Sequence, residues 1–233
     1  MKTVFFSLAS LLAVSAHAGI IATWDYAANF NVSNNPSAKS DFSYGNGAAP
    51  GTFILDNTTI LNCVGTPTAC LTDGASFPNS SSIIWNGIGA TNNYGTASQS
   101  ANDVGFNPQL SAGSILRFTV PTTNIYSVAG AFDTVDTSHH STNVFIYRGS
   151  TQLLSATVNA PGSVVPFSFS GLALSAGTTI DVIMTTNSDQ FNLNTGLHGT
   201  ITESTPSAAP EPATLALSLL VTRSMALSSP WRH

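Results

Sequence analysis

A polar segment at residues 133–142, which we predict to be a loop, contains the side chains with the clearest capacity for chemistry. Asp133 and Asp136 stand three positions apart in it, and His139 and His140 follow. Ca²⁺ takes about six to eight hard oxygen ligands, often carboxylates and carbonyls from loops. We therefore expect Asp133 and Asp136 to contribute to a structural calcium site, with the capping of a turn as the simpler alternative for both.

The same segment permits two other, weaker interpretations. Glycoside hydrolysis needs two carboxyl groups; Asp133 and Asp136 would have to supply them, because no Glu precedes Glu203. The two neighbouring histidines, with Asp136 and the distant His198, offer ligands for zinc or copper, although adjacent residues on a strand point to opposite faces. No Gly-x-Ser-x-Gly motif marks a nucleophile. The sequence therefore predicts a protein that is not an enzyme, with no cofactor apart from calcium.

Aromatic side chains on the surface are a second kind of candidate site, because a ring can serve as a platform for a sugar. Trp24 and Tyr94 are the best candidates, since both lie in segments rich in Asn. Tyr94 is the one aromatic residue at 88–102, a range that we predict to be a long surface loop. Trp85 follows two isoleucines and is expected in the core.

The elements that must position these side chains are β-strands. From residue 113 to 184 apolar and small polar residues alternate, with Leu116 and Phe118 on one face and Arg117 on the other. A period of two is typical of half-buried strands, and turn residues interrupt it about every 8–12 positions. We therefore predict a single all-β domain at residues 19–203, a jelly-roll-like antiparallel β-sandwich. Shorter strands are expected at 20–23, 41–45, 52–55, 83–85 and 104–107.

The charge balance excludes one class of partner. Charged residues make up 7% of the 233 residues and hydrophobic residues 42%, so the body can form a core and is not expected to be disordered. Between positions 19 and 209 three basic residues stand against ten acidic ones, a net charge of −7. Nucleic-acid binding needs a basic face that neutralises phosphates, and three cations cannot provide one.

The first 18 residues have the composition of a secretory signal peptide. Lys2 precedes an apolar run at residues 4–14, and Ala16 and Ala18 form a cleavage site of small residues. The run is too short to span a membrane stably. We expect signal peptidase to cleave after Ala18 and the protein to reach an oxidising compartment.

Cys63 and Cys70 are the only cysteines, with six residues between them. In an exported protein such a pair is expected to form a disulfide that closes a loop. A shared metal ion is the weaker interpretation, because no further soft ligand is nearby.

The C-terminal tail carries a recognisable pattern. It consists of a linker of small residues at 204–209, then Pro210, Glu211 and Pro212, an apolar run at 213–221, and Arg223. Together with the signal peptide, the tail at 210–233 resembles the sorting signal of PEP-CTERM proteins of Gram-negative, biofilm-forming bacteria. The resemblance implies that a membrane protease, the exosortase, removes a transmembrane anchor helix and that the protein reaches the cell surface or extracellular matrix. The anchor is shortened here, because about ten residues rise only about 15 Å as a helix, against a bilayer core of roughly 30 Å.

The body also resembles known domains, from Trp24 to Gly45 and over the strands from Leu116 to Ile201. It is similar to a sandwich domain common in PEP-CTERM proteins and to the jelly rolls of carbohydrate-binding modules, and the resemblance includes no catalytic motif. Our first hypothesis is therefore a structural or adhesive protein of the surface or biofilm matrix. The alternative is a carbohydrate-binding module for an exopolysaccharide. An extracellular hydrolase that uses Asp133 and Asp136 is a third, weaker hypothesis.

Overall fold

The computed structural model describes the body of the chain. The described residues are 19–36, 41–47, 50–61, 63, 69–74, 82–86, 92–94, 96–108, 112–138, 140–187 and 192–206. The chain divides into a body at residues 20–205 and a second unit made of residues 1–19 and 206–233. The expected signal peptide with Ala16 and Ala18, the motif Pro210, Glu211 and Pro212, and the expected anchor helix lie outside the described residues. Within these described ranges, no helix is long and apolar enough to cross a membrane.

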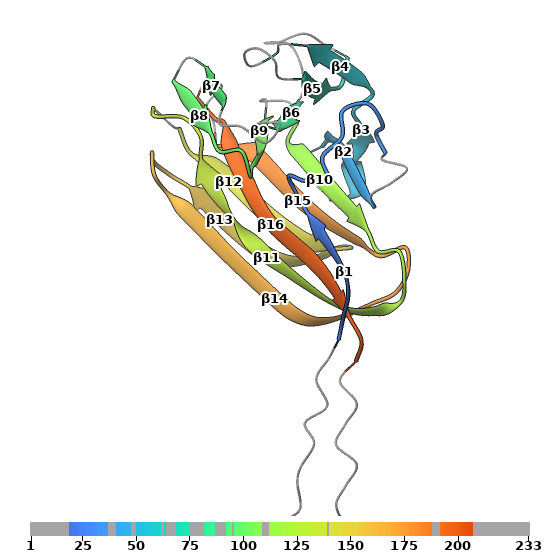
Figure 1. Ribbon diagram of the computed structural model, residues 1–233. Coiled ribbons are helices and arrows are strands. Elements are labelled where there is room, and N and C mark those ends of the chain that lie inside the picture. The colour runs from blue at the N-terminus through green and yellow to red at the C-terminus, as the bar shows by residue number, and fades with distance from the viewer. Residues whose placement is uncertain are drawn as a thin grey trace, which may run out of the picture. The chain divides into compact units, whose positions relative to one another are not determined.

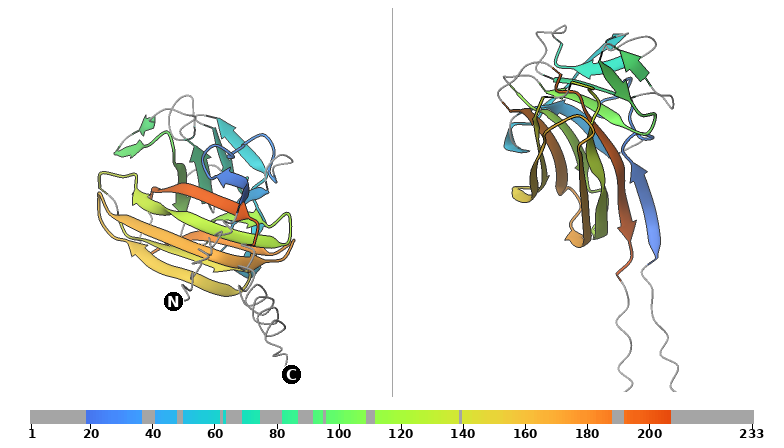
Figure 2. Two further views of the ribbon diagram at one scale, coloured as in Figure 1. Left: turned by 60° about the horizontal axis from the view of Figure 1, so that its bottom comes forward. Right: turned by 90° about the vertical axis from the view of Figure 1, so that its left-hand side faces the viewer.

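Two antiparallel sheets form the body (Figures 1 and 2). Sheet A contains, in spatial order, β14 (Val164–Leu174), β11 (Asn124–Thr134), β16 (Thr195–Ser204), β9 (Val104–Pro108), β6 (Ser82–Asn86), β5 (Ala69–Thr72) and β4 (Thr58–Leu61), with β1 (Ile20–Asp25) also paired to β16. Sheet B contains β13 (Thr151–Val158), β12 (Thr142–Arg148), β15 (Thr179–Thr186), β10 (Ser114–Thr119), β2 (Phe42–Asn46) and β3 (Ile54–Leu55). A short 3₁₀ helix at Pro50–Thr52 and a hairpin of β7 (Asn92–Tyr94) and β8 (Ala97–Gln99) complete the elements. The prediction of an all-β antiparallel sandwich is confirmed.

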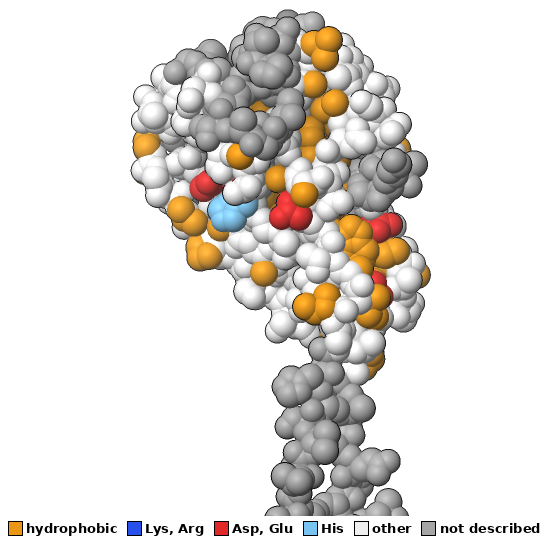
Figure 3. Space-filling model, in the orientation of Figure 1, with side chains coloured by type: hydrophobic (Ala, Val, Ile, Leu, Met, Phe, Trp, Pro, Cys, Tyr) orange, Lys and Arg blue, Asp and Glu red, His pale blue; other side chains and the backbone are white. Residues whose placement is uncertain are grey.

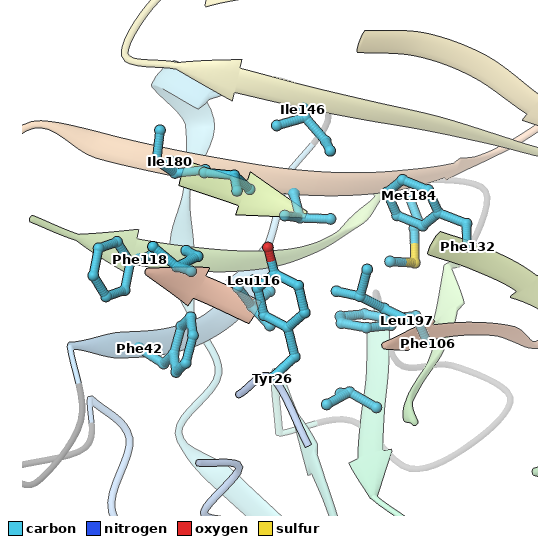
Figure 4. Close-up of a cluster of buried hydrophobic side chains, with 14 of the residues drawn as sticks. Tyr26, Phe42, Phe106, Leu116, Phe118, Phe132, Ile146, Ile180, Met184 and Leu197 are labelled. Carbon is cyan, nitrogen blue, oxygen red and sulfur yellow. The ribbon is translucent and has the colours of Figure 1, made fainter. Parts of the chain in front are cut away.

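The core lies between the sheets and consists of side chains that alternate along the strands. On β10 Leu116 and Phe118 are fully buried, whereas Arg117 between them faces the opposite side of the sheet. Figure 4 shows side chains of both sheets meeting in this core, among them Phe132 from sheet A and Met184 from sheet B. Each fully buried side chain of this size contributes about 1.5–3 kcal/mol, so the alternation seen in the sequence is what holds the two layers together.

Strand β16 has an unusual edge, because two strands share it. β9 pairs with residues 195–197 and β1 with residues 200–204, while β11 follows the whole opposite edge. His198 therefore lies where one neighbouring strand gives way to the other. Ile20 pairs with Ser204, so the first and last strands of the body are joined side by side.

The expectation of one long surface loop at 88–102 is wrong. The segment contains the hairpin of β7 and β8, and Ala97 and Gln99 on β8 are 4% and 0% exposed. The Gln99 side-chain amide donates a hydrogen bond of 2.8 Å to the backbone carbonyl of Asp103. The hairpin is thus tied to the chain just before β9, although its sequence has few residues that favour strands.

Two other local expectations can be compared with the structure. Asp133 belongs to β11, which continues to Thr134, and not to the polar loop that we expected to start there. The disulfide between Cys63 and Cys70 is confirmed, with the two Cα atoms 6.1 Å apart. Cys70 lies on β5, one of two strands around the disulfide that the sequence did not reveal.

Candidate functional site

The described part of the body has a pocket of ≈ 390 Å³ beside the end of β1. It is lined by the turn after β1 and by residues of β5 and β6, namely Ala27, Ala28, Phe30, Asn31, Val32, Ala69 and Asn86. Five of these residues are apolar, and the two asparagines add amide groups that both donate and accept hydrogen bonds. Apolar walls with a few polar groups are typical of small-molecule sites, whose volumes are about 300–1,000 Å³.

Side-chain hydrogen bonds fix the turn that forms most of the pocket wall. The Asp25 carboxylate accepts a hydrogen bond of 2.8 Å from the N–H of Ala28, and the Asn29 side chain accepts one of 2.9 Å from the N–H of Asp25. Asn86 on β6 donates from its side-chain amide to the carbonyl of Ala27 at 2.6 Å. Asp and Asn stabilise turns in this way because their short side chains reach nearby backbone groups. The wall is therefore preorganised, which lowers the cost of binding.

The chain beyond the turn is anchored as well. The hydroxyl of Thr59 donates to the carbonyl of Val32 at 2.9 Å. Asn35 donates to the carbonyl of Tyr44 at 2.6 Å and accepts from the N–H of the same residue at 2.9 Å. The ring of Phe30 packs edge-on against that of Tyr44, with 4.9 Å between centroids. Phe30 is thus held at the pocket by contact with the core.

A second polar group lies on the outer face of sheet A, where β11, β16 and β9 are neighbours. Asp103, Asp133 and His198 each offer a ligand atom, and these three atoms lie within 4.8 Å of one another. The Nδ1 atom of His198 is 3.3 Å from Oδ1 of Asp103, and the two side chains are 43% and 4% exposed. Figure 3 shows a histidine beside an acidic side chain on this face, and no Lys or Arg side chain is visible among the coloured residues.

Gly196 makes room for this group, and its neighbour Gly105 makes room for Trp85. In the register of sheet A, Gly196 lies between Asp133 on β11 and Gly105 on β9. A Cβ atom on Gly196 would lie 2.0 Å from Oδ1 of Asp133 and 3.4 Å from Oδ2 of Asp103. The two carboxylates therefore pack against Gly196 at a distance that no residue with a side chain would permit. Gly105 accommodates the indole of Trp85 in the same way, because a Cβ atom there would lie 2.3 Å from Cε2.

The two carboxylates in this group are poorly solvated. The pKa of Asp133 is raised to about 6, mainly by burial and in addition by the charge of Asp103, while the charge of His198 acts in the opposite direction. Burial also raises the pKa of Asp103, and His198 again opposes the shift. The Oδ1 atom of Asp133 is buried and has no hydrogen-bond partner. Such an environment favours a bound proton or cation, because either one removes an uncompensated negative charge.

Asp136 does not belong to this group. It is 3% exposed, and its carboxylate accepts hydrogen bonds of 2.9 Å from the backbone N–H and the side-chain amide of Asn194. Asp136 therefore has the simpler role of fixing a loop, and the structure brings Asp133 together with Asp103 and His198 instead. The calcium site at Asp133 and Asp136 stays a prediction. Sequence analysis missed Asp103, because only the pairing of strands reveals its neighbours.

The aromatic candidates have different outcomes. Trp24 is half-buried, and its ring centroid lies 5.0 Å from that of Phe118 in the core. Trp85 is fully buried, as predicted, in a small cluster with Cys70. Tyr94 lies on β7, and both its side chain and the whole of His139 are outside the described residues. Trp24 is not among the described residues that line the pocket, and the sequence did not indicate the residues that are.

Comparisons with known proteins give no family for this chain. No family model matches it, and no curated protein matches it. An adhesin domain of Lys-gingipain from Porphyromonas gingivalis is 14% identical, with a TM-score of 0.36 over 48% of this chain and 79% of that one. A xylan-binding domain from Paenibacillus barcinonensis is 11% identical, with a TM-score of 0.31 over 47% and 76%. A carbohydrate-binding module in complex with a galactotriose is 12% identical, with a TM-score of 0.33 over 64% and 99%. At this level of similarity, none of them says what this chain binds.

Proposed function

We propose that this chain is an exported surface protein whose jelly-roll-like body binds a polysaccharide in the pocket beside β1. The observation that carries the proposal is the pocket, with its ≈ 390 Å³, its apolar walls and its two asparagines. A sugar ring presents C–H groups on its faces and hydroxyl groups around its rim. The faces can pack against Phe30 and the alanines, while the side-chain amide of Asn31 donates hydrogen bonds to the hydroxyls.

The pocket also favours a neutral ligand. Among the described residues that line it, none carries a charge, so none of these side chains would offset the cost of desolvating an anionic group. We therefore propose glycan binding ahead of the purely structural or adhesive role that we expected first. Adhesion to a matrix polysaccharide is then a consequence of binding.

A substitution that fills the pocket tests the proposal. Ala28 lines the pocket and is exposed, so Ala28→Trp should block the site without disturbing the core. Ala176→Trp is the matched control, because Ala176 is exposed in a turn away from the pocket lining. On a glycan array and in affinity electrophoresis with neutral polysaccharides, we expect wild type and control to bind, and Ala28→Trp to bind about tenfold more weakly or worse.

The opposite results have clear meanings. Equal binding by Ala28→Trp and wild type would reject the pocket as the site. No binding to any polysaccharide would leave the structural role as the better hypothesis. Release of oligosaccharides by wild type, lost in Asp133→Asn, would favour the hydrolase over a binding protein.

Export and sorting are part of the proposal and rest on the sequence of the two ends. We propose that signal peptidase cleaves after Ala18 and that an exosortase cleaves near Pro210, which delivers the body to the cell surface or matrix. Mass spectrometry of the protein from its native host should find a mature chain with both ends removed. A freely soluble protein that still ends at His233 would contradict sorting by an exosortase.

A further inference from the structure

We propose that Asp103, Asp133 and His198 form a binding site for a divalent transition-metal ion such as Zn²⁺ on the outer face of sheet A. The three residues come from β11, from β16 and from the position just before β9. None of them lines the pocket. The inference therefore does not depend on the proposed function.

The donor atoms suit such an ion. Zn²⁺ binds imidazole nitrogen and carboxylate oxygen at about 2.0–2.2 Å, and many of its sites use three protein ligands and one open position. Ligand atoms at these bond lengths and tetrahedral angles lie roughly 3.4 Å apart. The Nδ1 atom of His198 and Oδ1 of Asp103 are already 3.3 Å apart. The set of three spans at most 4.8 Å, so small side-chain rotations would bring it around an ion.

A separate observation points to a ligand in the same place. Oδ1 of Asp133 is buried without a hydrogen-bond partner, and it occupies the position beside Gly196 that a Cβ atom would take. An unpaired buried carboxylate oxygen beside a second buried carboxylate is costly. A divalent cation would satisfy this oxygen and balance both negative charges at once. A side chain at position 196 would displace this oxygen.

The surroundings favour access and retention of the ion. His198 is 43% exposed at its side chain, so the site opens to solvent through the imidazole. Among the described residues, the only permanently charged cations are Arg117 and Arg148, and both belong to sheet B. All three ligands lie on or next to paired strands, which hold ligands more precisely than loops do.

The choice of metal follows from the same donors. Calcium takes about six to eight oxygen ligands, whereas this group offers two carboxylates and one nitrogen. Imidazole suits zinc, copper, iron and nickel. We therefore expect the site to prefer Zn²⁺ over Ca²⁺, in contrast to the calcium site expected at Asp133 and Asp136.

The test is a metal titration of the full chain after treatment with EDTA and removal of any purification tag. Isothermal titration calorimetry with Zn²⁺ should give one site per chain, and Co²⁺ should give visible absorption bands that Zn²⁺ abolishes. His198→Gln and Asp133→Asn should each weaken Zn²⁺ binding by about 100-fold or more, beyond the roughly 10–100-fold typical of groups that only orient a ligand. His140→Gln is the matched control and should bind Zn²⁺ like wild type.

Three results would overturn the proposal. The first is no saturable Zn²⁺ binding by wild type. The second is unchanged binding in both site variants, and the third is loss of binding in His140→Gln, which would place the ion at the neighbouring histidines. Circular dichroism must show that each variant is folded. If Asp133→Asn does not fold, the result for His198→Gln alone tests the proposal, because the exposed imidazole contributes little to the core.

Discussion

Replacing Arg117 by leucine should destabilise the body by about 3–5 kcal/mol. Arg117 on β10 lies opposite Asp181 on β15, and its Nε and Nη2 atoms donate to the two carboxylate oxygens at 2.7 and 2.8 Å. The guanidinium carbon also lies 4.2 Å from the centre of the Phe53 ring. Asp181 is 0% exposed, so removal of the arginine leaves a buried carboxylate without its charge partner, a change that typically costs about this much.

The effect is large compared with the total stability of a domain, which is about 5–15 kcal/mol. In a domain of this size 1 kcal/mol shifts the melting temperature by about 2–4 °C, so we expect a fall of roughly 6–20 °C. The double variant Arg117→Leu, Asp181→Leu should recover most of the loss, because it leaves no unpaired buried charge.

Urea unfolding followed by tryptophan fluorescence, with the disulfide intact, measures all three proteins. The slope of the free energy against urea should stay constant, so that shifts in the midpoint report stability alone. A loss below about 1 kcal/mol in Arg117→Leu, the size expected of an exposed ion pair, would refute the reasoning. A double variant less stable than the single one would refute it as well.

Other parts of the body make further measurable contributions. Tyr26→Phe should raise stability by about 1 kcal/mol, because it removes a buried hydroxyl that has no hydrogen-bond partner; Tyr126→Phe should lower it, because that hydroxyl donates to a backbone carbonyl at 2.8 Å. If the two changes have equal effects in thermal unfolding, the unpaired hydroxyl is not the cause. Replacing Cys63 and Cys70 together by serine should cost about 2–3 kcal/mol in urea unfolding, and an unchanged midpoint would contradict this. In EDTA, wild type should become more stable relative to Asp133→Asn as the pH falls from about 7 to about 4. The reason is that Asp133 takes up its proton near pH 6 in the folded state, whereas its ordinary pKa is 3.8. A difference that does not vary with pH would show that the pKa is not raised.

The strands with alternating apolar and polar residues could be predicted from the sequence, because the alternation also identifies which face of each strand is buried. Leu116 and Phe118 on β10 are examples. The hairpin of β7 and β8 could not be predicted, because Asn is depleted in strands. A contact with a distant part of the chain holds it in place, namely the hydrogen bond of 2.9 Å from the N–H of Ser98 to the carbonyl of Val135. Local sequence therefore predicts the layers better than the short strands at their ends.

Neither site could be predicted, for a related reason. Asp103 and His198 stand 95 positions apart, and they meet only because β9 pairs with β16. Asp133 joins them because β11 pairs with the other edge of β16. The pocket wall depends on the hydrogen bond between Asn86 and Ala27, which are 59 positions apart. Strand register and hydrogen bonds between distant residues leave no local pattern in the sequence. The disulfide was predictable because its two cysteines are close in sequence and are the only ones in the chain.

The pairing of Ile20 with Ser204 decides how the body would respond to mechanical load. If force pulled these two residues apart, it would open the ladder between β1 and β16 like a zipper, one hydrogen bond at a time. A sugar held just beyond the far end of β1 would instead load that ladder along its length when the chain is tethered through Ser204. All hydrogen bonds of the ladder would then resist shear together. The body should therefore withstand far more force between a bound sugar and Ser204 than between Ile20 and Ser204.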